Sequence, residues 1–274
     1  MSDALAAAPQ RAPRAPRLRA IGFRDIAEAL QRGWQDFLRA PLYGLFFGGV
    51  FALGGIAIYL LLVVYDAPWM IIPIAIGFPL IGPFVAAGLY EVSRRLAAGT
   101  PLSWRAVLVT VFRQRERQLG WMAFVVLFIF WVWLYQARIL LAIFMGFSAP
   151  SSLDKFLAVV VSTQSGLSFL AVGTVVGLVL ALILFAVTVF AMPMLLDTEV
   201  DFVTATVTSI RAVFASPLPM LGWGVVVTVL TLVALAPMFL GLLIILPVLG
   251  HATWHLYAVA RAEDVTPPGS ATDS

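Results

Sequence analysis

Residues 40–65 read APLYGLFFGGVFALGGIAIYLLLVVY, which is 26 consecutive residues without a charge. Arg39 precedes this stretch and Asp66 follows it. A helix needs about 20 apolar residues to cross the hydrocarbon core of a bilayer, which is about 30 Å thick. The stretch therefore predicts a transmembrane helix at 41–65, and the same criterion can be applied to the rest of the chain.

Further uncharged stretches predict more spans. They occupy 67–90, 156–196 and 212–260, while 119–144 contains a single charge, Arg138. Two of these stretches hold more than one element: the Ser- and Thr-rich segment 152–165 is interpreted as interfacial, and 212–260 is expected to reverse at Ala236-Pro237. The six expected spans are 41–65, 70–92, 119–144, 168–194, 218–235 and 238–260.

Composition supports a membrane protein and excludes other classes. The 274 residues are 62% hydrophobic and 11% charged, whereas a soluble domain is usually about 45–50% apolar and about 25% charged. The chain has no cysteine, which excludes a disulfide scaffold, a zinc–thiolate site and thiol chemistry. The alternating pattern of a β-barrel is missing. We therefore expect an all-α, polytopic membrane protein whose six transmembrane helices form three hairpins.

Basic residues predict the orientation. In the six-span topology 15 Lys and Arg residues lie on one side and Lys155 alone lies on the other, so the positive-inside rule places both termini in the cytoplasm. The Ala-, Pro- and Arg-rich residues 1–20 are expected to form a disordered tail attracted by anionic lipids, with no cleaved signal peptide. The membrane domain is expected at 21–262, and a second disordered tail at 263–274. Because the arginines lie on short segments beside the spans, nucleic acid is not an expected partner.

Three segments have the apolar spacing of an amphipathic helix, and one precedes each hairpin. They are 23–39, 103–116 and 201–214, and we expect each to lie in the cytoplasmic interface. Ser103 is expected to cap the second helix. In the first helix, the apolar face comprises Phe23, Ile26, Ala27, Leu30, Trp34, Phe37 and Leu38, and the polar face comprises Arg24, Asp25, Glu28, Gln31, Arg32, Gln35, Asp36 and Arg39.

The regular order of these segments suggests three repeated units. Phe37, Pro41, Leu42, Leu45 and Gly48 align with Phe214, Pro217, Leu218, Leu221 and Gly224. The segment 79–82 likewise resembles 247–250. Repeats of this kind occur in transporters, but duplication produces them without transport as well.

Several motifs resemble a known family. They are GFPLIGPF at 77–84, GLYEVSRR at 88–95, PMLLD at 193–197 and LGHATWHLY at 249–257. The chain is identified by them as a member of domain-of-unknown-function family 2189, which comprises predicted bacterial inner-membrane proteins. The resemblance implies a multi-pass protein of the bacterial inner membrane and no established activity. Some members are labelled as cytochrome c oxidase subunits.

The two histidines, His251 and His255, test that label. They lie four residues apart and share one helical face, whereas two axial ligands of one heme come from opposite sides of it. A heme–copper centre needs more histidines than this chain has, so an oxidase core is rejected and no cofactor is expected. A metal site completed by Glu91 or by a partner subunit is the alternative to two structural histidines that hydrogen-bond to neighbouring helices. We favour the structural interpretation, with the second span as the neighbour.

Other candidates are single charges, prolines and glycines. Arg138 is expected to extend to the outer interface, although a charge within a span can also be functional. The acids Asp197, Glu199 and Asp201 are expected at a helix N-terminus, with cation binding as the alternative. Glu91 is expected to pair with Arg95. Pro73, Pro79 and Pro83 predict a kinked or broken span, and Gly44-x-x-x-Gly48 and Gly173-x-x-x-Gly177 permit close helix contacts.

Two functions are compatible with these features. The first is a non-enzymatic protein that associates with or stabilises larger membrane complexes, with membrane lipids, other subunits or a second copy as partners. The second is a carrier or channel for a small solute or lipid. A polar cavity that reaches the middle of the membrane would favour the second function. No Walker loop, dinucleotide fingerprint, serine elbow or HExxH motif is present, so an enzyme is not expected.

Overall fold

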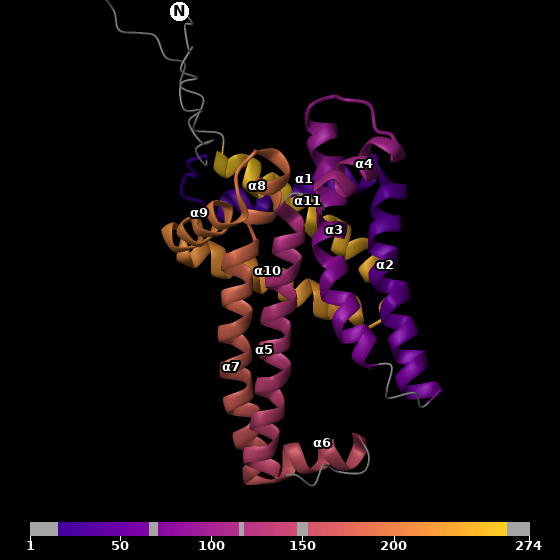
Figure 1. Cartoon of the computed structure of the whole chain (residues 1–274), viewed down its shortest axis with the longest axis vertical. Coiled ribbons are helices and arrows are strands. Elements are labelled where there is room, and N and C mark those ends of the chain that lie inside the picture. The colour runs from indigo at the N-terminus through magenta and orange to yellow at the C-terminus, as the bar shows by residue number, and fades with distance from the viewer. Residues whose placement is uncertain (1–15, 66–70, 115–117, 147–152, 262–274) are drawn as a thin grey trace, which may run out of the picture.

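A computed structural model describes residues 16–65, 71–114, 118–146 and 153–261, and in these ranges every regular element is a helix (Figure 1). The helices are α1 (Phe23–Arg39), α2 (Pro41–Tyr59) with the π-helical turn η1 (Leu60–Val64), α3 (Ile71–Ala97), α4 (Trp104–Gln114), α5 (Gly120–Met145), α6 (Leu153–Ser162), α7 (Gln164–Thr188), α8 (Ala191–Asp197), α9 (Phe202–Ala215), α10 (Pro217–Leu235) and α11 (Leu242–Arg261). The expected all-α class is confirmed.

Five helical segments in the described ranges are long and apolar enough to cross a membrane. They are α2, α5, α7 together with α8, α10 and α11. The expected second span is occupied by α3, a helix of 27 residues, and a sixth crossing stays a prediction. The expected fourth span, 168–194, is divided, because α7 ends at Thr188 and α8 begins at Ala191.

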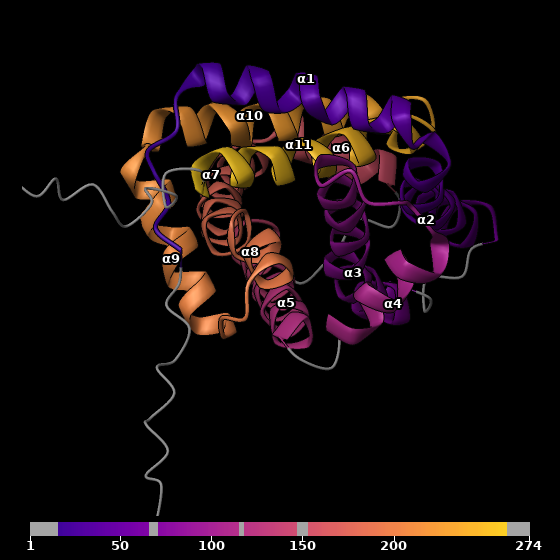
Figure 2. The same cartoon turned by 90° about the horizontal axis from the view of Figure 1, so that it is seen from above.

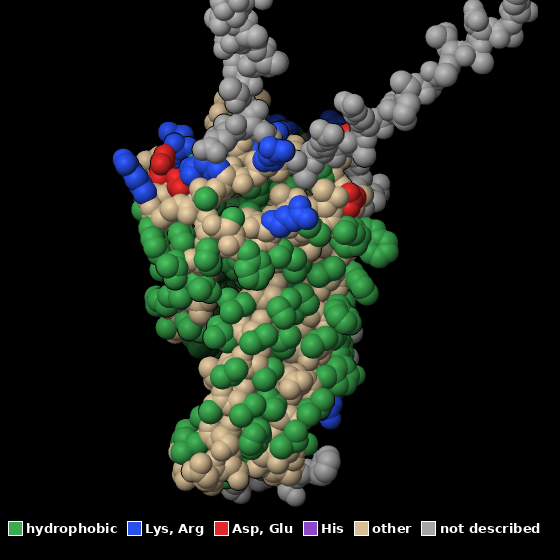
Figure 3. All heavy atoms as spheres, turned by 90° about the vertical axis from the view of Figure 1, so that its left-hand side faces the viewer, with side chains coloured by type: hydrophobic (Ala, Val, Ile, Leu, Met, Phe, Trp, Pro, Cys, Tyr) green, Lys and Arg blue, Asp and Glu red, His purple; other side chains and the backbone are tan. Residues whose placement is uncertain are grey.

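The helices form two long hairpins crossed by an oblique layer. The hairpins α2–α3 and α5–α7 run along the long axis in Figure 1 and are seen nearly end-on in Figure 2, where α1, α10 and α11 lie side by side across them. Helices α4, α8 and α9 lie at the same end as α1, and α6 lies across the opposite end. Lys and Arg side chains gather at the first end (Figure 3), which we call the basic end; the opposite end is the far end.

The best-buried part of the molecule lies near the basic end, around α8 and α11. There Phe190, Met194, Trp223 and Tyr257 are almost fully buried. Further toward the far end, α5 and α7 expose large apolar side chains, among them Phe128. Helices that are apolar all round and exposed in this way are typical of membrane spans.

Glycines permit α11 to approach α2 closely. A Cβ atom at Gly48 would lie 2.9 Å from the carbonyl oxygen of Leu242 of α11. One at Gly44 would lie 3.2 Å from Pro247 of α11 and 2.6 Å from the Phe37 ring of α1. The contacts expected of Gly44 and Gly48 therefore form within the chain. At Gly173 and Gly177 the nearest atoms lie 4.0 Å and 3.9 Å from the Cβ position, so these glycines are not in close contact.

Helix α1 is rotated relative to the expected amphipathic face. Asp36, assigned to the polar face from the sequence, is buried, whereas Phe23, Trp34 and Leu38 of the apolar face are exposed. The reason is the contact at Gly33, where a Cβ atom would lie 2.7 Å from the backbone of α11. The buried residues of α1 are Ile26, Ala29, Gly33, Asp36 and Phe37.

Proline positions and helix links were also expected from the sequence. The sequence predicts a kinked or broken second span, and the break is absent, because α3 is one continuous helix through positions 73, 79 and 83. The links before α2 and α10 have nearly the same backbone conformation: φ −134° and ψ 52° at Ala40, and φ −139° and ψ 61° at Ser216. Each link precedes a proline at the first helical turn, which supports the alignment of these two units.

Candidate functional site

Polar side chains meet around α11 near the basic end. In the described part of the chain the buried polar residues are Asp36, Glu91, Ser93, Ser209, Ser216, His251 and His255. Four of them connect α1, α3 and α11, and we call Asp36, Ser93, His251 and His255 the histidine cluster. They are brought together because α11 lies along α1 on one side and contacts α3 on another.

His255 is bonded to Asp36. Its Nε2 lies 2.6 Å from Oδ2 of Asp36, and both side chains are almost fully buried. Burial alone would raise the pKa of Asp36, but hydrogen bonds from His255 and Ser93 outweigh it and lower that pKa below its ordinary value. The pair joins α1 to α11 through a charge-assisted contact in apolar surroundings.

His251 lies against α3, the neighbour expected from the sequence, although its partner there is Ser93 and not Glu91. Oγ of Ser93 is 2.8 Å from Nδ1 of His251, and the imidazole is fully buried. Nε2 of His251 is buried without a hydrogen-bond partner among the described residues. Both imidazoles therefore face protein, as predicted.

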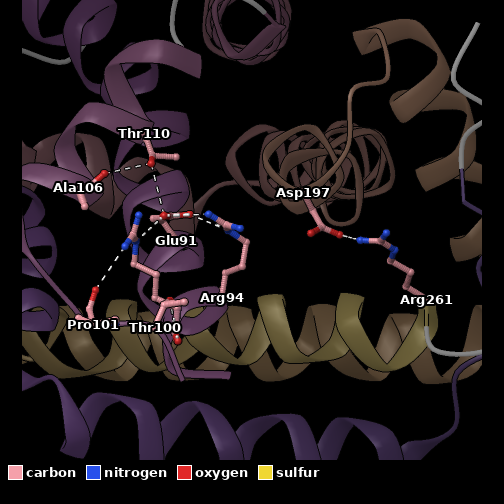
Figure 4. Close-up of polar contacts among 9 residues, drawn as sticks. Glu91, Arg94, Thr100, Pro101, Ala106, Thr110, Asp197 and Arg261 are labelled. Atoms are coloured by element: carbon pink, nitrogen blue, oxygen red, sulfur yellow. Dashed lines mark hydrogen bonds and ion pairs between the residues drawn. The ribbon is translucent and has the colours of Figure 1, made fainter. Parts of the chain in front are cut away.

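Glu91 binds two arginines of its own helix (Figure 4). Nε of Arg95 lies 2.6 Å from the carboxylate and Nε of Arg94 lies 2.7 Å from it. The Glu91 side chain is fully buried, and Thr110 of α4 approaches it at 3.4 Å. The expected Glu91–Arg95 pair is present, and Arg94 adds a second guanidinium to the same carboxylate.

The expected acidic cluster is divided among different roles. Asp197 ends α8, pairs with Arg261 and accepts a hydrogen bond of 3.0 Å from the Tyr257 hydroxyl. Asp201 caps α9 by accepting a hydrogen bond of 2.9 Å from the backbone N–H of Thr204. Hydrogen bonds from Thr204 lower the pKa of Asp201. Glu199 lies between them and is exposed.

These observations place the buried Glu91 of α3 and the half-buried Asp197 of α8 at one end of an apolar bundle. Residues 71–197 match the family model described as predicted integral membrane protein (DUF2189). The chain is an integral membrane protein. No curated protein matches the chain, and no solved structure matches it.

The DUF2189 match contains only part of the polar site. It runs from the start of α3 to the end of α8 and includes Glu91, Ser93 and Asp197. Asp36, His251 and His255 lie outside it. The matched segment is joined to the rest of the chain by the contacts of α3 with α1 and α11, which include the Ser93–His251 hydrogen bond.

The structure does not assemble the candidate metal ligands into a common site. Glu91 binds arginines, His255 binds Asp36 and His251 binds Ser93. Across the described ranges no three His, Asp or Glu side chains are placed to hold a metal ion. The histidine cluster holds three helices together through the Asp36–His255 and Ser93–His251 contacts.

Arg138 and the first residues of the chain complete the set of candidates. Arg138 is exposed on the far half of α5, about 27 Å along the helix from Gly120 at 1.5 Å per residue. That the Arg138 side chain extends to the outer interface stays a prediction.

In the expected N-terminal tail, Arg19 binds Asp25 at 2.8 Å and donates a hydrogen bond to the Val259 carbonyl at 3.2 Å. Residues 1–15 and 262–274 lie outside the described residues.

Sequence reasoning missed Asp36, Ser93 and Tyr257 as partners. Asp36 lies three residues after the buried Gly33, and Ser93 lies three residues after the buried Tyr90. Each therefore lies on the same helical face as a buried residue. That spacing was the available signal for Asp36. Their partners are 219 and 158 residues away in the chain, and local patterns carry no information about such pairs.

Proposed function

We propose that this protein is a non-enzymatic component of the bacterial inner membrane that associates with larger membrane complexes and stabilises them. The contact surface that we assign to this role is the far half of the α5–α7 hairpin. This hairpin extends beyond α2–α3 toward the far end (Figure 1). The observation that supports the proposal is a groove between its two helices.

The groove combines small and polar residues within apolar helices. It has a volume of about 220 Å³, and its lining includes Trp133, Gln136, Gly173, Thr174 and Gly177. The two glycines leave room beside the backbone. Close approach at small residues and hydrogen bonds from Gln or Thr side chains are what associates helices in lipid. We therefore propose that a transmembrane helix of a partner protein packs one face against the groove, so that side chains of that helix, and not the helix itself, enter it.

The second function, a carrier or channel, receives less support. Two cavities of about 280 Å³ and about 220 Å³ lie between the spans. Apart from hydroxyl groups of Tyr90, Thr188, Thr231 and Thr253, their lining is apolar. Such walls suit hydrocarbon and offer a polar solute few hydrogen-bond partners.

The experiment is affinity capture of the tagged full chain from native membranes, followed by mass spectrometry. Gly177→Leu fills the groove, and Gly224→Leu is the matched control, because nothing lies within 4 Å of the Cβ position at Gly224. We expect the wild type and the control to capture the same membrane proteins and Gly177→Leu to lose most of them. Recovery of the tagged chain alone from wild-type membranes would contradict the proposal.

A further inference from the structure

We propose that the bundle binds one anionic phospholipid along α3, with an acyl chain in a central recess and its phosphate at Arg94. The central recess consists of the two cavities between the spans. They share Gly82, Ala86, Tyr90, Val227 and Thr253, so they adjoin. Their walls come from both hairpins and from the oblique layer of α10 and α11.

The size of the recess selects a hydrocarbon chain over a partner helix. A helix at least 10 Å across occupies about 420 Å³ per turn of 5.4 Å. The two cavities measure about 280 Å³ and about 220 Å³, so neither has room for one such turn. An extended acyl chain is narrower, and the surrounding bilayer supplies it. The apolar lining matches this occupant in chemistry as well.

A row of residues on α3 connects the recess to the basic end. Gly82, Ala86, Tyr90 and Arg94 are spaced by four and therefore follow one face of the helix. The first three line the recess, and Arg94 is the next position toward the basic end. In Figure 4, Arg94 lies on the side of Glu91 that faces Asp197. A lipid lying along this row would have its headgroup at Arg94.

Charge at this point complements an anionic headgroup. Glu91 is one carboxylate bound by two guanidinium groups, from Arg94 and Arg95, so the group carries one net positive charge. The Glu91 side chain is fully buried, whereas 42% of the Arg94 side chain is exposed. Arg94 can therefore bind a phosphate while Arg95 continues to neutralise Glu91.

Gly82 provides the test of the acyl-chain site. No heavy atom lies within 4 Å of its Cβ position, so a larger side chain can enter the recess without meeting the backbone. Gly82→Leu would occupy the space that we assign to the lipid. Gly224→Leu is again the matched control, since it lies on α10 outside the residues that line the recess.

The first experiment measures lipid retention by native mass spectrometry. The purified full chain is incubated with vesicles of equal phosphatidylglycerol and phosphatidylcholine content, and bound lipids are counted. We expect one retained phosphatidylglycerol for the wild type and for Gly224→Leu. Gly82→Leu should lower retention about tenfold, which corresponds to 1.4 kcal/mol. Equal retention by Gly82→Leu and the wild type would overturn the proposal.

A second pair of variants tests the headgroup. Arg94→Gln should abolish the preference for phosphatidylglycerol over phosphatidylcholine, while Arg113→Gln, at an exposed position on α4, should keep it. A wild type that binds both lipids equally would contradict the assignment to Arg94. Gly177 is not among the residues that line the recess, so the capture experiment above and this one can fail independently.

Fluorescence quenching tests the acyl-chain site without a substitution at Gly82, and so it remains informative if Gly82→Leu does not fold. Trp223 lines the larger cavity, so phosphatidylglycerol with brominated acyl chains should quench its fluorescence. The Trp223 signal is obtained as the difference between the wild type and Trp223→Phe. Quenching of this component supports the acyl-chain site. A Trp223 component that is unaffected by the brominated lipid would overturn it.

Discussion

Asp36 shows how tertiary contacts can reverse the role of a side chain. It belongs to the charged residues of an amphipathic helix, and yet its exposed fraction is 4%. Hydrogen bonds compensate for the burial of the carboxylate: His255 lies 2.6 Å away, and Ser93 provides a second hydrogen bond. A buried charge without such partners would be strongly destabilising. The partner, more than the residue type, determines where Asp36 can lie.

His251 leads to a prediction about hydrogen bonding. His251→Leu leaves the Ser93 hydroxyl facing an apolar side chain, so we expect a loss of stability of about 1–3 kcal/mol. His251→Gln keeps a polar group near Ser93 and should be tolerated better. Thermal unfolding of both variants in detergent measures the difference. If the two midpoints are equal, the bond to Ser93 does not stabilise the fold.

Asp36 leads to a prediction about pH. Its folded-state pKa is lowered from the ordinary value of 3.8, so the ionised form is favoured by folding. The resulting stability is present above that value and is lost as the pH falls through the lowered pKa. Asp36→Asn removes this titration. We expect the wild type to lose more stability than Asp36→Asn between pH 5 and pH 3, measured by thermal unfolding; parallel pH profiles would contradict this.

Helix packing in this protein depends on glycine more than on large apolar residues. Helix α11 approaches α1 at Gly33 and α2 at Gly48, where a Cβ atom would lie 2.7 Å and 2.9 Å from its backbone, and at Gly44 a Cβ atom would lie 2.6 Å from the ring of Phe37 of α1. Lipid provides little hydrophobic force between helices, so close van der Waals contact is the main source of association. These glycines are therefore required by the contact, and not by turn geometry.

Gly33→Ala tests this element-scale conclusion. The new Cβ would lie 2.7 Å from both the Ala252 nitrogen and the Val248 oxygen, and backbone atoms cannot rotate away. We expect a loss of about 1–3 kcal/mol from overpacking, measured by thermal unfolding. The control Gly224→Ala enters open space and should be neutral or stabilising by about 0.5–1 kcal/mol. Similar losses in both variants would mean that helix propensity, not contact, is responsible.

At the scale of the molecule, charge separates the two ends. Lys and Arg gather at the basic end on the face shown in Figure 3, and the far end carries α6 and the long α5–α7 hairpin. Loops at the basic end connect α3 to α4 and α8 to α9, whereas the last residues of α5 and the first residues of α7 lie toward the far end (Figure 1). This arrangement agrees with the charge bias in the sequence.

Topology is the prediction at this scale. Reporter fusions at Asp66, Ser151 and Pro237 are expected to be periplasmic, and a fusion at Gly99 is expected to be cytoplasmic. Activity of a periplasmic reporter such as alkaline phosphatase, compared with a cytoplasmic one at the same positions, measures this. A cytoplasmic result at Ser151 would contradict the six-span topology at its centre.

Helix type and approximate position could be predicted from the sequence, because uncharged length and helical spacing are local properties. The Glu91–Arg95 pair and the Asp201 region lie within one or two turns, so they too were within reach. The Glu91–Arg94 pair was equally predictable, because residues three apart on a helix are also neighbours. The division of α7 from α8 was not predictable, since the residues on both sides of the break are equally apolar.

The sequence by itself determined that this chain is an all-α membrane protein, where its apolar helices lie, and which segments carry its charge. Those properties depend on the transfer of side chains between water and lipid, which each residue contributes almost independently. Only the tertiary structure decided that Asp36 is buried, that His251 binds Ser93, and that a recess opens beside Gly82. These depend on how close α11 comes to α1 and α3, because packing contacts and buried hydrogen bonds act over a few ångströms between residues far apart in the chain.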